Sequence, residues 1–284
     1  MKMKNILITL FASVIFLTAC QKEPSFEDPN SIPGGGTGGG SSRGLLIRNV
    51  EVSGTDSNVS VYSYNGANRL IGFEASGAGI DINYTIKRNT AGIIIQTVIK
   101  SPQLVAQGID SLATNIYYNG SASRYTHSIY SLTLSGFTIS DSTVFTYDAS
   151  GNISTAIAYT QIPIIGYKPT SKQEYLYGGG NLTSQKLYDY DDLTQTWVLD
   201  ETLTVTYDAK VNPLQLGVEA IIIGSPTLFG PNNSLTQNYT DATDPANNNS
   251  RSNSFTYNIA NKPSGGTSVV NPGAANSTLR FYYN

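Results

Sequence analysis

The sequence is poor in the residues that most often build metal centres and catalytic sites. Cysteine and histidine occur once each, as Cys20 and His127. A single cysteine excludes a disulfide framework or a cysteine-based metal site, and a single histidine excludes a multi-histidine metal site. A Ser-His-Asp arrangement would have only His127 as its base. A lone histidine among Tyr, Ser and Thr is more often a surface or pairing residue.

Charge is scarce as well. Charged residues make up 13% of the chain, and the formal net charge is −3. Such a balance leaves no basic footprint for nucleic acid, so we expect no nucleic-acid partner. The sequence also lacks the clustered runs of Lys and Arg that bind anionic lipid headgroups.

The first residues have the layout of a secretion signal. Lys2 and Lys4 precede an apolar stretch, residues 6–16, that is too short to span a bilayer comfortably. Residues 17–20, Leu-Thr-Ala-Cys, resemble the bacterial lipobox, after which the cysteine is lipidated and becomes the first residue. We therefore predict a signal peptide over residues 1–19 and a membrane anchor through lipid on Cys20, with the thiol consumed in a thioether.

Residues 20–43 are predicted to be the lipidated cysteine and a disordered tether, because Gly and Pro dominate them. Such a coil reaches roughly 25–30 Å. Lys22 and Glu23 resemble the start of the surface-export signal of Bacteroidota lipoproteins, although Pro24 departs from that pattern. This favours an outer-membrane lipoprotein at the cell surface over one on the periplasmic face.

Residues 44–284 are predicted to form a single all-β domain. The chain contains 19 Tyr and 27 Gly, which favour strands and turns. Tyrosines at 118, 147, 177 and 207 are spaced 29, 30 and 30 residues apart, and Tyr257 follows. Each marks the end of a strand before a turn. The count predicts about 14–16 strands in a long antiparallel meander of hairpins, curled into a barrel-like or an open curved sheet.

One hairpin unit can be read from its alternation. Leu203, Val205 and Tyr207 alternate with threonines, which predicts a half-buried strand. Residues 148–152 predict a turn, since Asp and Asn cap their own backbone there. After the turn, residues 153, 155, 157 and 159 are predicted to share one face.

Three other stretches carry expectations of their own. Residues 102–112 have room for one short turn or helix. The apolar runs 92–99 and 218–223 predict strands that are buried on both faces.

The repeated unit resembles a known pattern. Residues 147–152, Tyr-Asp-Ala-Ser-Gly-Asn, resemble the YD repeats of large bacterial secreted proteins. Together with the lipobox, the tether and the segment 212–233, they resemble an uncharacterised family of Bacteroidota lipoproteins with a porin-like fold. The resemblance implies a long meander in an open or closed barrel, and it supplies no activity or site residue.

Candidate chemistry is sparse. The acidic residues 189–192 have the oxygen ligands that Ca²⁺ needs but not the spacing of a calcium loop, so a solvated turn is favoured. Asp81, Asp141, Asp148 and Asp208 are expected at turns or strand edges. The glycines 34–40 and 178–180 lack the Lys-Ser/Thr of a phosphate loop. We therefore predict no catalytic, cofactor or metal residues, and Cys20 is the one predicted site.

Aromatic residues offer a binding alternative. Tyrosine rings on a sheet can stack on sugars, but they also form cross-strand pairs that stabilise it. Trp197 is expected in the core or at an edge.

Three functions stay open. The favoured one is a non-catalytic cell-envelope lipoprotein that presents its β-meander for binding or structural interaction. The second is a surface lipoprotein that binds glycans and works with other envelope proteins. A glycan-active enzyme is a less favoured form of this second function. The third is an outer-membrane barrel or pore.

Overall fold

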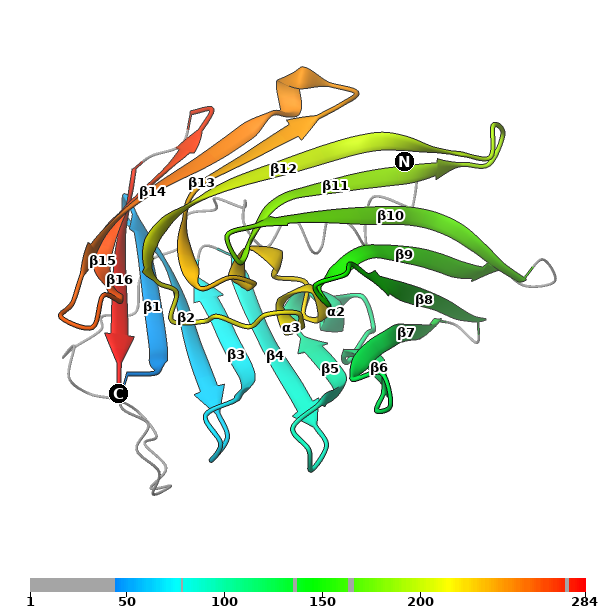
Figure 1. Ribbon diagram of the computed structural model, residues 1–284, viewed down its shortest axis with the longest axis horizontal. Coiled ribbons are helices and arrows are strands. Elements are labelled where there is room, and N and C mark those ends of the chain that lie inside the picture. Colours follow the sequence, from blue (N-terminus) through cyan, green and yellow to red (C-terminus); the bar gives the residue numbers. More distant parts are fainter. Residues whose placement is uncertain (1–43, 78, 135–136, 163–165, 274–275) are drawn as a thin grey trace.

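The computed structural model describes residues 44–77, 79–134, 137–162, 166–273 and 276–284. The signal peptide, the tether and Cys20 therefore lie outside the described residues, and their assignments stay predictions. In the described part, sixteen antiparallel strands each pair with the next along the chain, and β1 pairs with β16 (Figure 1). The predicted all-β meander is confirmed, and it closes into a barrel.

The strands have the following bounds: β1 Leu46–Ser53, β2 Asp56–Tyr64, β3 Leu70–Gly77, β4 Ile80–Arg88, β5 Ile94–Lys100, β6 Leu112–Asn119, β7 Arg124–Leu134, β8 Phe137–Tyr147, β9 Ile153–Ile162, β10 Gly166–Gly178, β11 Asn181–Asp191, β12 Thr196–Val211, β13 Asn232–Asp241, β14 Asn249–Tyr257, β15 Pro263–Asn271 and β16 Ser277–Tyr283. The helical segments are α2 Pro102–Ala106, α3 Glu219–Ile222, η2 Pro226–Leu228 and η3 Pro245–Asn247. The expected short helix within residues 102–112 is α2. In the described part of the chain, none of these helices has the length and apolar composition needed to cross a membrane.

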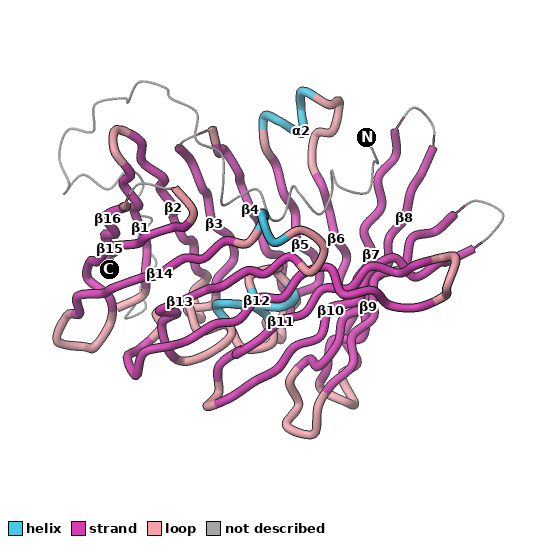
Figure 2. Tube along the Cα trace, turned by 90° about the horizontal axis from the view of Figure 1, so that it is seen from above, coloured by secondary structure: helices cyan, strands magenta, loops and turns pink. Residues whose placement is uncertain are grey.

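The barrel has two rims. The proximal rim holds the turns that follow the even-numbered strands. It also holds Gly44, whose N–H donates to the carbonyl of Asn284 at 2.7 Å. The distal rim holds the turns that follow the odd-numbered strands, and α2 lies there, at the edge of the barrel in Figure 2. The chain therefore enters and leaves the barrel at the proximal rim.

Polar residues occupy most outward positions of three strands. Leu203 and Val205 of β12 are buried, whereas Thr204 and Thr206 between them are exposed, as the alternation predicts. The same alternation leaves side chains of β4 and β14 exposed on the outside, namely Asp81, Asn83, Thr85, Lys87, Ser252, Ser254 and Thr256. Other strands also expose apolar side chains, among them Val61, Ile95, Val144 and Leu176.

Bulges recur beside the proximal rim. The register shifts immediately before Tyr64, Tyr118, Tyr147, Tyr177 and Tyr207. A bulge inserts one extra residue and re-aims the side chains beyond it. The prediction that residues 153, 155, 157 and 159 share a face is wrong for this reason. Ile153 and Ala156 are the buried residues of β9, because Ser154 is the extra residue in the bulge.

Candidate functional site

The connection between β12 and β13 enters the barrel and closes its proximal end. Figure 1 shows this segment, residues 212–231, inside the ring of strands; we call it the plug. Two contacts of Asn212 close its base: its backbone N–H donates to Pro231 O at 2.7 Å, and its side-chain Nδ2 donates to Gly230 O at 2.9 Å. The plug is therefore fixed where it leaves the sheet.

The strand expected at residues 218–223 is wrong, because these residues form α3 of the plug. A short apolar run fits a buried helix as well as a buried strand. Gly217 and Gly224, at φ +57° and +73°, bracket the run in the left-handed backbone region that favours glycine. The second apolar run, 92–99, does contain a strand, β5, but the expected burial on both faces is wrong, because Ile94 is buried and Ile95 is 43% exposed.

The plug joins the two apolar clusters of the lumen. Ile223 packs with Leu70, Ile94 and their neighbours in one cluster. Ala220, Ile221 and Phe229 belong to the other cluster, with Ile153, Ala156, Tyr175 and Leu182. Apolar area buried in this way stabilises by about 25 cal/mol per Å². The lumen near the proximal rim is thus a packed core.

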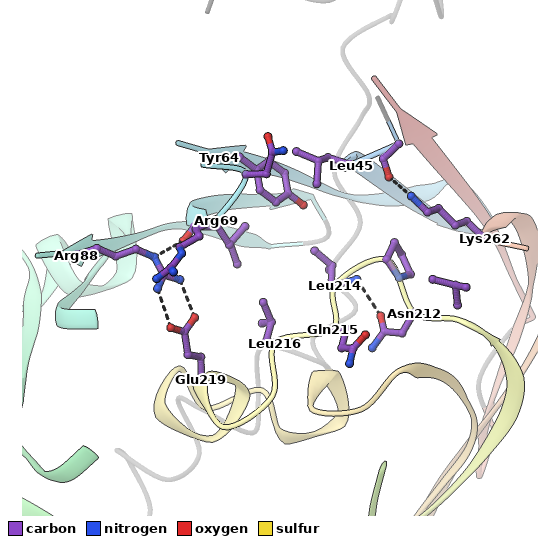
Figure 3. Close-up of a pocket in the computed structure, with 15 residues that line it drawn as sticks. Leu45, Tyr64, Arg69, Arg88, Asn212, Leu214, Gln215, Leu216, Glu219 and Lys262 are labelled. Carbon is purple, nitrogen blue, oxygen red and sulfur yellow. Dashed lines mark hydrogen bonds and ion pairs between the residues drawn. The ribbon is translucent and has the colours of Figure 1, made fainter. Parts of the chain in front are cut away.

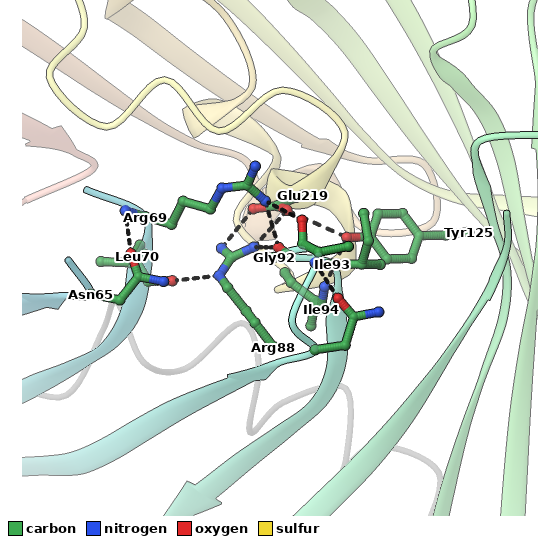
Figure 4. A network of polar contacts seen from close by, with 11 residues as sticks. Asn65, Arg69, Leu70, Arg88, Gly92, Ile93, Ile94, Tyr125 and Glu219 are labelled. Carbon is green, nitrogen blue, oxygen red and sulfur yellow. Dashed lines mark hydrogen bonds and ion pairs between the residues drawn. The ribbon is translucent and has the colours of Figure 1, made fainter. Parts of the chain in front are cut away.

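A buried ion pair clasps the plug to the barrel wall. Arg88 of β4 donates through both terminal nitrogens to the two carboxylate oxygens of Glu219, at 2.7 and 2.8 Å (Figure 4). The Arg88 side chain is 5% exposed and that of Glu219 is 23% exposed. The hydroxyl of Tyr125 adds a third contact to Glu219 at 3.3 Å. Burial, followed by the Glu219 charge, raises the pKa of Tyr125.

The hairpin tyrosines tie neighbouring strands together at the proximal rim. We use this name for five residues whose hydroxyls donate, at 2.7–2.8 Å, to a carbonyl at the first or second residue of the preceding odd-numbered strand. The pairs are Tyr64 with Leu46, Tyr147 with Tyr125, Tyr177 with Ile153, Tyr207 with Leu182, and Tyr283 with Pro263.

Two repeat tyrosines depart from that pattern. Tyr257 donates to the carboxylate of Asp208, and Tyr118 packs edge-on against Tyr125 with ring centroids 5.2 Å apart. The expectation that Tyr207 is the last residue of its strand is wrong, because β12 continues to Val211. These geometries fit the structural interpretation of the tyrosines better than the sugar-stacking one.

A pocket of about 360 Å³ opens between the plug and the proximal rim (Figure 3). Arg69, Arg88 and Lys262 bring cationic groups to it, and Asn212 and Gln215 bring amides. Both oxygens of Glu219 already accept from Arg88, so the carboxylate has little capacity left for a ligand. The pocket can therefore hold a polar or anionic group more readily than a cation.

A second cavity, of about 210 Å³, lies on the luminal side of the plug. Arg251 and Glu51 form an ion pair at 2.8 Å across its wall, and the Tyr62 hydroxyl donates to Asn49 Oδ1 at 2.8 Å. The rings of Phe255 and Phe281 stand edge to face with centroids 6.0 Å apart. Amides, a neutral ion pair and aromatic rings are the groups that bind an uncharged polar ligand.

Carboxylates gather toward the distal rim. Burial, and then the charges of neighbouring acids, raise the pKa of Asp200 and Glu201. Hydrogen bonds from Asn247 and from the backbone of its own turn lower the pKa of Asp241. Within the described residues, no three His, Cys, Asp or Glu side chains are arranged to hold a metal ion.

Asp148 and Asp191 serve the backbone of their own turns, as expected. The Asp191 carboxylate accepts from Leu193 N–H and from the hydroxyl and N–H of Thr194, so residues 189–192 lead into a solvated turn. Asp148 caps its own turn at Ser150 and Asn152.

Asp141 and Asp208 differ from the expectation. Asp141 lies in the middle of β8 opposite Tyr130, and both its Oδ1 and the Tyr130 hydroxyl are buried without a partner. Asp208 lies within β12 and joins it to β13 through Asn233. The alternation of the sequence does not reveal either arrangement, because each depends on a residue of a neighbouring strand, Tyr130 in β7 for Asp141 and Asn233 in β13 for Asp208.

The lone histidine and the lone tryptophan lie in aromatic contacts. His127 of β7 stacks on Tyr117 with centroids 4.2 Å apart, and its Nδ1 is 3.0 Å from Thr126 Oγ1. Trp197 is half-buried near the start of β12, edge-on to Tyr190 at 5.0 Å. Each residue is accounted for by pairing within the sheet.

These features define a class: an antiparallel sixteen-stranded barrel that is plugged at one end by an internal segment. Two solved structures are similar to it. A porin-like protein from Bacteroides uniformis matches with a TM-score of 0.51 at 12% identity, over 86% of this chain and 98% of that one. A porin-like protein from Bacteroides vulgatus matches with a TM-score of 0.49 at 11% identity, over 84% and 98%.

The first of these similarities confirms the expected porin-like fold, and identity this low shows the fold alone. No protein-family model matches the sequence, and a search of curated proteins gives no match.

Proposed function

We propose that this chain is a non-catalytic, lipid-anchored protein of the bacterial cell envelope, whose plugged barrel stands in water as a binding or structural-interaction domain. The observation that carries the proposal is the plug. Ala220 at 0% exposure and Phe229 at 7% fill the lumen near the proximal rim, where a channel would need open space. The barrel is built as a closed scaffold at that end.

The outer face supports the same proposal. A barrel that spans a membrane presents apolar residues to lipid at every second position, with aromatic girdles at both interfaces. Here the outward positions of β4 and β14 are Thr, Ser, Asn, Asp and Lys, and those of β12 are mostly Thr, with Val198 exposed among them. Burying such side chains in hydrocarbon would cost several kcal/mol without partners, whereas water hydrates them.

The envelope location rests on the sequence. Residues 17–20 resemble a lipobox, and acyl chains on Cys20 would hold the domain at a membrane without help from the barrel wall. The porin-like fold of a Bacteroides protein is compatible with an envelope role. The absence of catalysis is part of the proposal, and it is supported by the pairing of Arg88 with Glu219 and of Arg251 with Glu51 in the two cavities.

Electrical recording tests whether the plug closes the lumen to ions. The purified full-length protein is added to a planar lipid bilayer, beside a known porin as positive control. We expect no conductance steps from this protein, because the plug closes the lumen and the outer face does not enter lipid. Stable, porin-like conductance steps would refute the proposal in favour of the pore.

A glycan ligand is the second candidate, and the luminal cavity favours it. Its amides, its ion pair and the rings of Phe255 and Phe281 suit a ligand of about one sugar ring. A glycan array probed with the parent protein and with Arg251→Met tests this candidate. Glycan signals that appear with the parent and vanish with the variant would support it, and an empty array would count against it.

A further inference from the structure

We infer that the proximal rim is a membrane-facing surface that binds anionic lipid headgroups, so that the distal rim points away from the membrane. The inference rests on the lipid anchoring proposed above and adds an orientation and a lipid class. It is carried by the distribution of charge between the two rims and by the place where the chain enters the barrel.

Four cations from separate segments meet at the proximal rim. Arg69 follows β2, Arg124 begins β7, Lys210 lies near the end of β12, and Lys262 follows β14. Arg69, Arg124 and Lys210 are exposed, and Lys262 is half-buried. Within the described residues, none of the four has an ion-pair partner. The closed barrel thus assembles a basic surface that the linear sequence, lacking Lys/Arg runs, does not display.

Three of these cations are held in place by aromatic rings. The guanidinium of Arg124 lies 4.8 Å from the ring centroid of Tyr147. The ammonium of Lys262 lies 5.6 Å from the ring of Tyr283, and that of Lys210 lies 5.9 Å from the ring of Tyr257. Such contacts are attractive within about 6 Å. Because these tyrosines are themselves hydrogen-bonded to the barrel, the cations form a defined surface.

The acids of the proximal rim are engaged by the protein itself. Asp148 accepts hydrogen bonds from its own turn. Asp208 accepts from Asn233 and from Lys210 N–H, and Glu219 is paired with Arg88. Hydrogen bonds from N–H groups leave the charges of Asp148 and Asp208 in place, so four cations without an ion-pair partner face two such carboxylates among the described residues, and the rim is net positive.

The distal rim has the opposite charge. Its turns and strand ends carry Asp56, Asp81, Asp110, Asp191, Asp192 and Asp244. The cations in the described part of this rim are Lys100 and Lys168, and Lys168 lies 3.6 Å from Asp192. An anionic membrane surface attracts nearby Lys and Arg and repels carboxylates over about one Debye length, 8 Å at physiological salt.

The entry of the chain agrees with the charges. Gly44, the first described residue, is bound to the C-terminal side of the barrel seam, through its N–H to Asn284 O and through its carbonyl to Lys262 Nζ. A tether that connects Cys20 to Gly44 therefore leaves from the basic rim. The position of the anchor and the distribution of charge both favour an orientation with the proximal rim toward the membrane.

The test uses the full, lipidated chain with one added thiol. Cys20 is the one cysteine of the sequence and is consumed by lipid, so Ala122→Cys or Leu193→Cys gives a single labelling site. Ala122 lies in the proximal turn between β6 and β7, and Leu193, 95% exposed, lies in the distal turn between β11 and β12. Energy transfer to a headgroup-labelled lipid is measured in phosphatidylcholine vesicles with and without phosphatidylglycerol.

In anionic vesicles at low salt, we expect several-fold greater transfer from position 122 than from 193, and we expect added salt to reduce the difference. The double substitution Arg124→Glu with Lys210→Glu should abolish the excess of transfer from position 122 over position 193. Lys100→Glu with Lys168→Glu makes the same change in net charge at the distal rim and should preserve it. If the Arg124→Glu, Lys210→Glu variant loses the β-sheet circular dichroism signal, the Arg124→Gln, Lys210→Gln variant is used in its place.

Equal transfer from both positions in anionic vesicles, or equal effects of the two charge-reversal pairs, would overturn the inference. Flotation of the same samples with the vesicles distinguishes failure of the inferred orientation from failure of the proposed lipid anchoring. Protein that floats with vesicles but shows no preference refutes the orientation alone. Protein that does not float lacks the anchor, and both proposals then fail.

Discussion

Each of the five hairpin tyrosines places the same two groups at the proximal end of its hairpin, a half-buried ring and a hydroxyl on a neighbouring strand's carbonyl. A ligand site usually contains different residues at different positions, whereas packing in a repeated fold requires the same residue in every copy. Tyr207 continues the alternation of Leu203 and Val205, and the extra residue of the bulge beside it, Leu235, lies on the neighbouring strand β13.

Replacing Tyr207 separates the ring from the hydroxyl. Tyr207→Phe removes only the 2.7 Å hydrogen bond to Leu182 and should cost about 1 kcal/mol. Tyr207→Ala also removes the half-buried ring and should cost about 2 kcal/mol. Thr206→Ala, on the exposed face next to it, should cost under about 1 kcal/mol.

Equilibrium urea unfolding of the three variants and the parent measures these differences. If Tyr207→Ala were as stable as the parent and yet lost binding on a glycan array, the ligand-binding interpretation of the tyrosines would replace the structural one.

The same hydroxyls make the barrel sensitive to alkali. Burial raises the pKa of Tyr64, Tyr147, Tyr177, Tyr207 and Tyr283 above the ordinary value. The unfolded chain releases these protons near pH 10, while the folded chain retains them. The stabilisation is therefore complete below about pH 10 and is lost as the pH rises further.

Phenolate absorbance and circular dichroism, followed together from neutral to alkaline pH, check this expectation. We expect a set of tyrosines to ionise only as the β-sheet signal is lost. Full ionisation of all tyrosines near pH 10 in a barrel that keeps its β-sheet signal would contradict it.

The plug shows where sequence reasoning succeeds and where it stops. The hairpin period and the Thr/Val alternation are local signals, so they predicted the strands of the meander and the turn at residues 148–152. The run 218–223 carried no signal for its partner, because the Arg88 that clasps Glu219 lies 131 residues away. Bulges add one residue to a strand and reverse its faces, and nothing in the alternation of residues 153–159 marks that step.

Breaking the clasp should destabilise the barrel. Glu219→Gln leaves the Arg88 guanidinium buried without a counter-charge, and removing one partner of a buried pair costs about 3 kcal/mol or more. Asp192→Asn breaks the exposed pair with Lys168 and should cost under about 1 kcal/mol.

Urea unfolding of the two variants gives the comparison, and hydrogen exchange localises the change. The Ile223 amide, which donates to Glu219 O at 2.9 Å, should exchange faster in Glu219→Gln. Equal small effects of the two substitutions would show that the plug is held by apolar packing alone.

At the scale of the whole molecule, three independent features agree. The outward positions of β4, β12 and β14 are mainly polar, one end is filled, and the chain enters at the filled, basic end. The proposal that such a barrel stays in water requires a separate anchor to hold it at a membrane. The lipobox-like sequence at Cys20 would supply that anchor.

Fractionation of a Cys20→Ala variant, expressed with palmitate labelling beside the parent, tests this account most directly. The parent should incorporate the fatty acid and sediment with membranes. We expect the variant to carry no fatty acid and to leave the membrane fraction in a detergent-free alkaline carbonate wash, because the barrel wall does not enter lipid. A variant that is still embedded in the membrane after that wash would contradict the account and would identify the barrel itself as the membrane-spanning part.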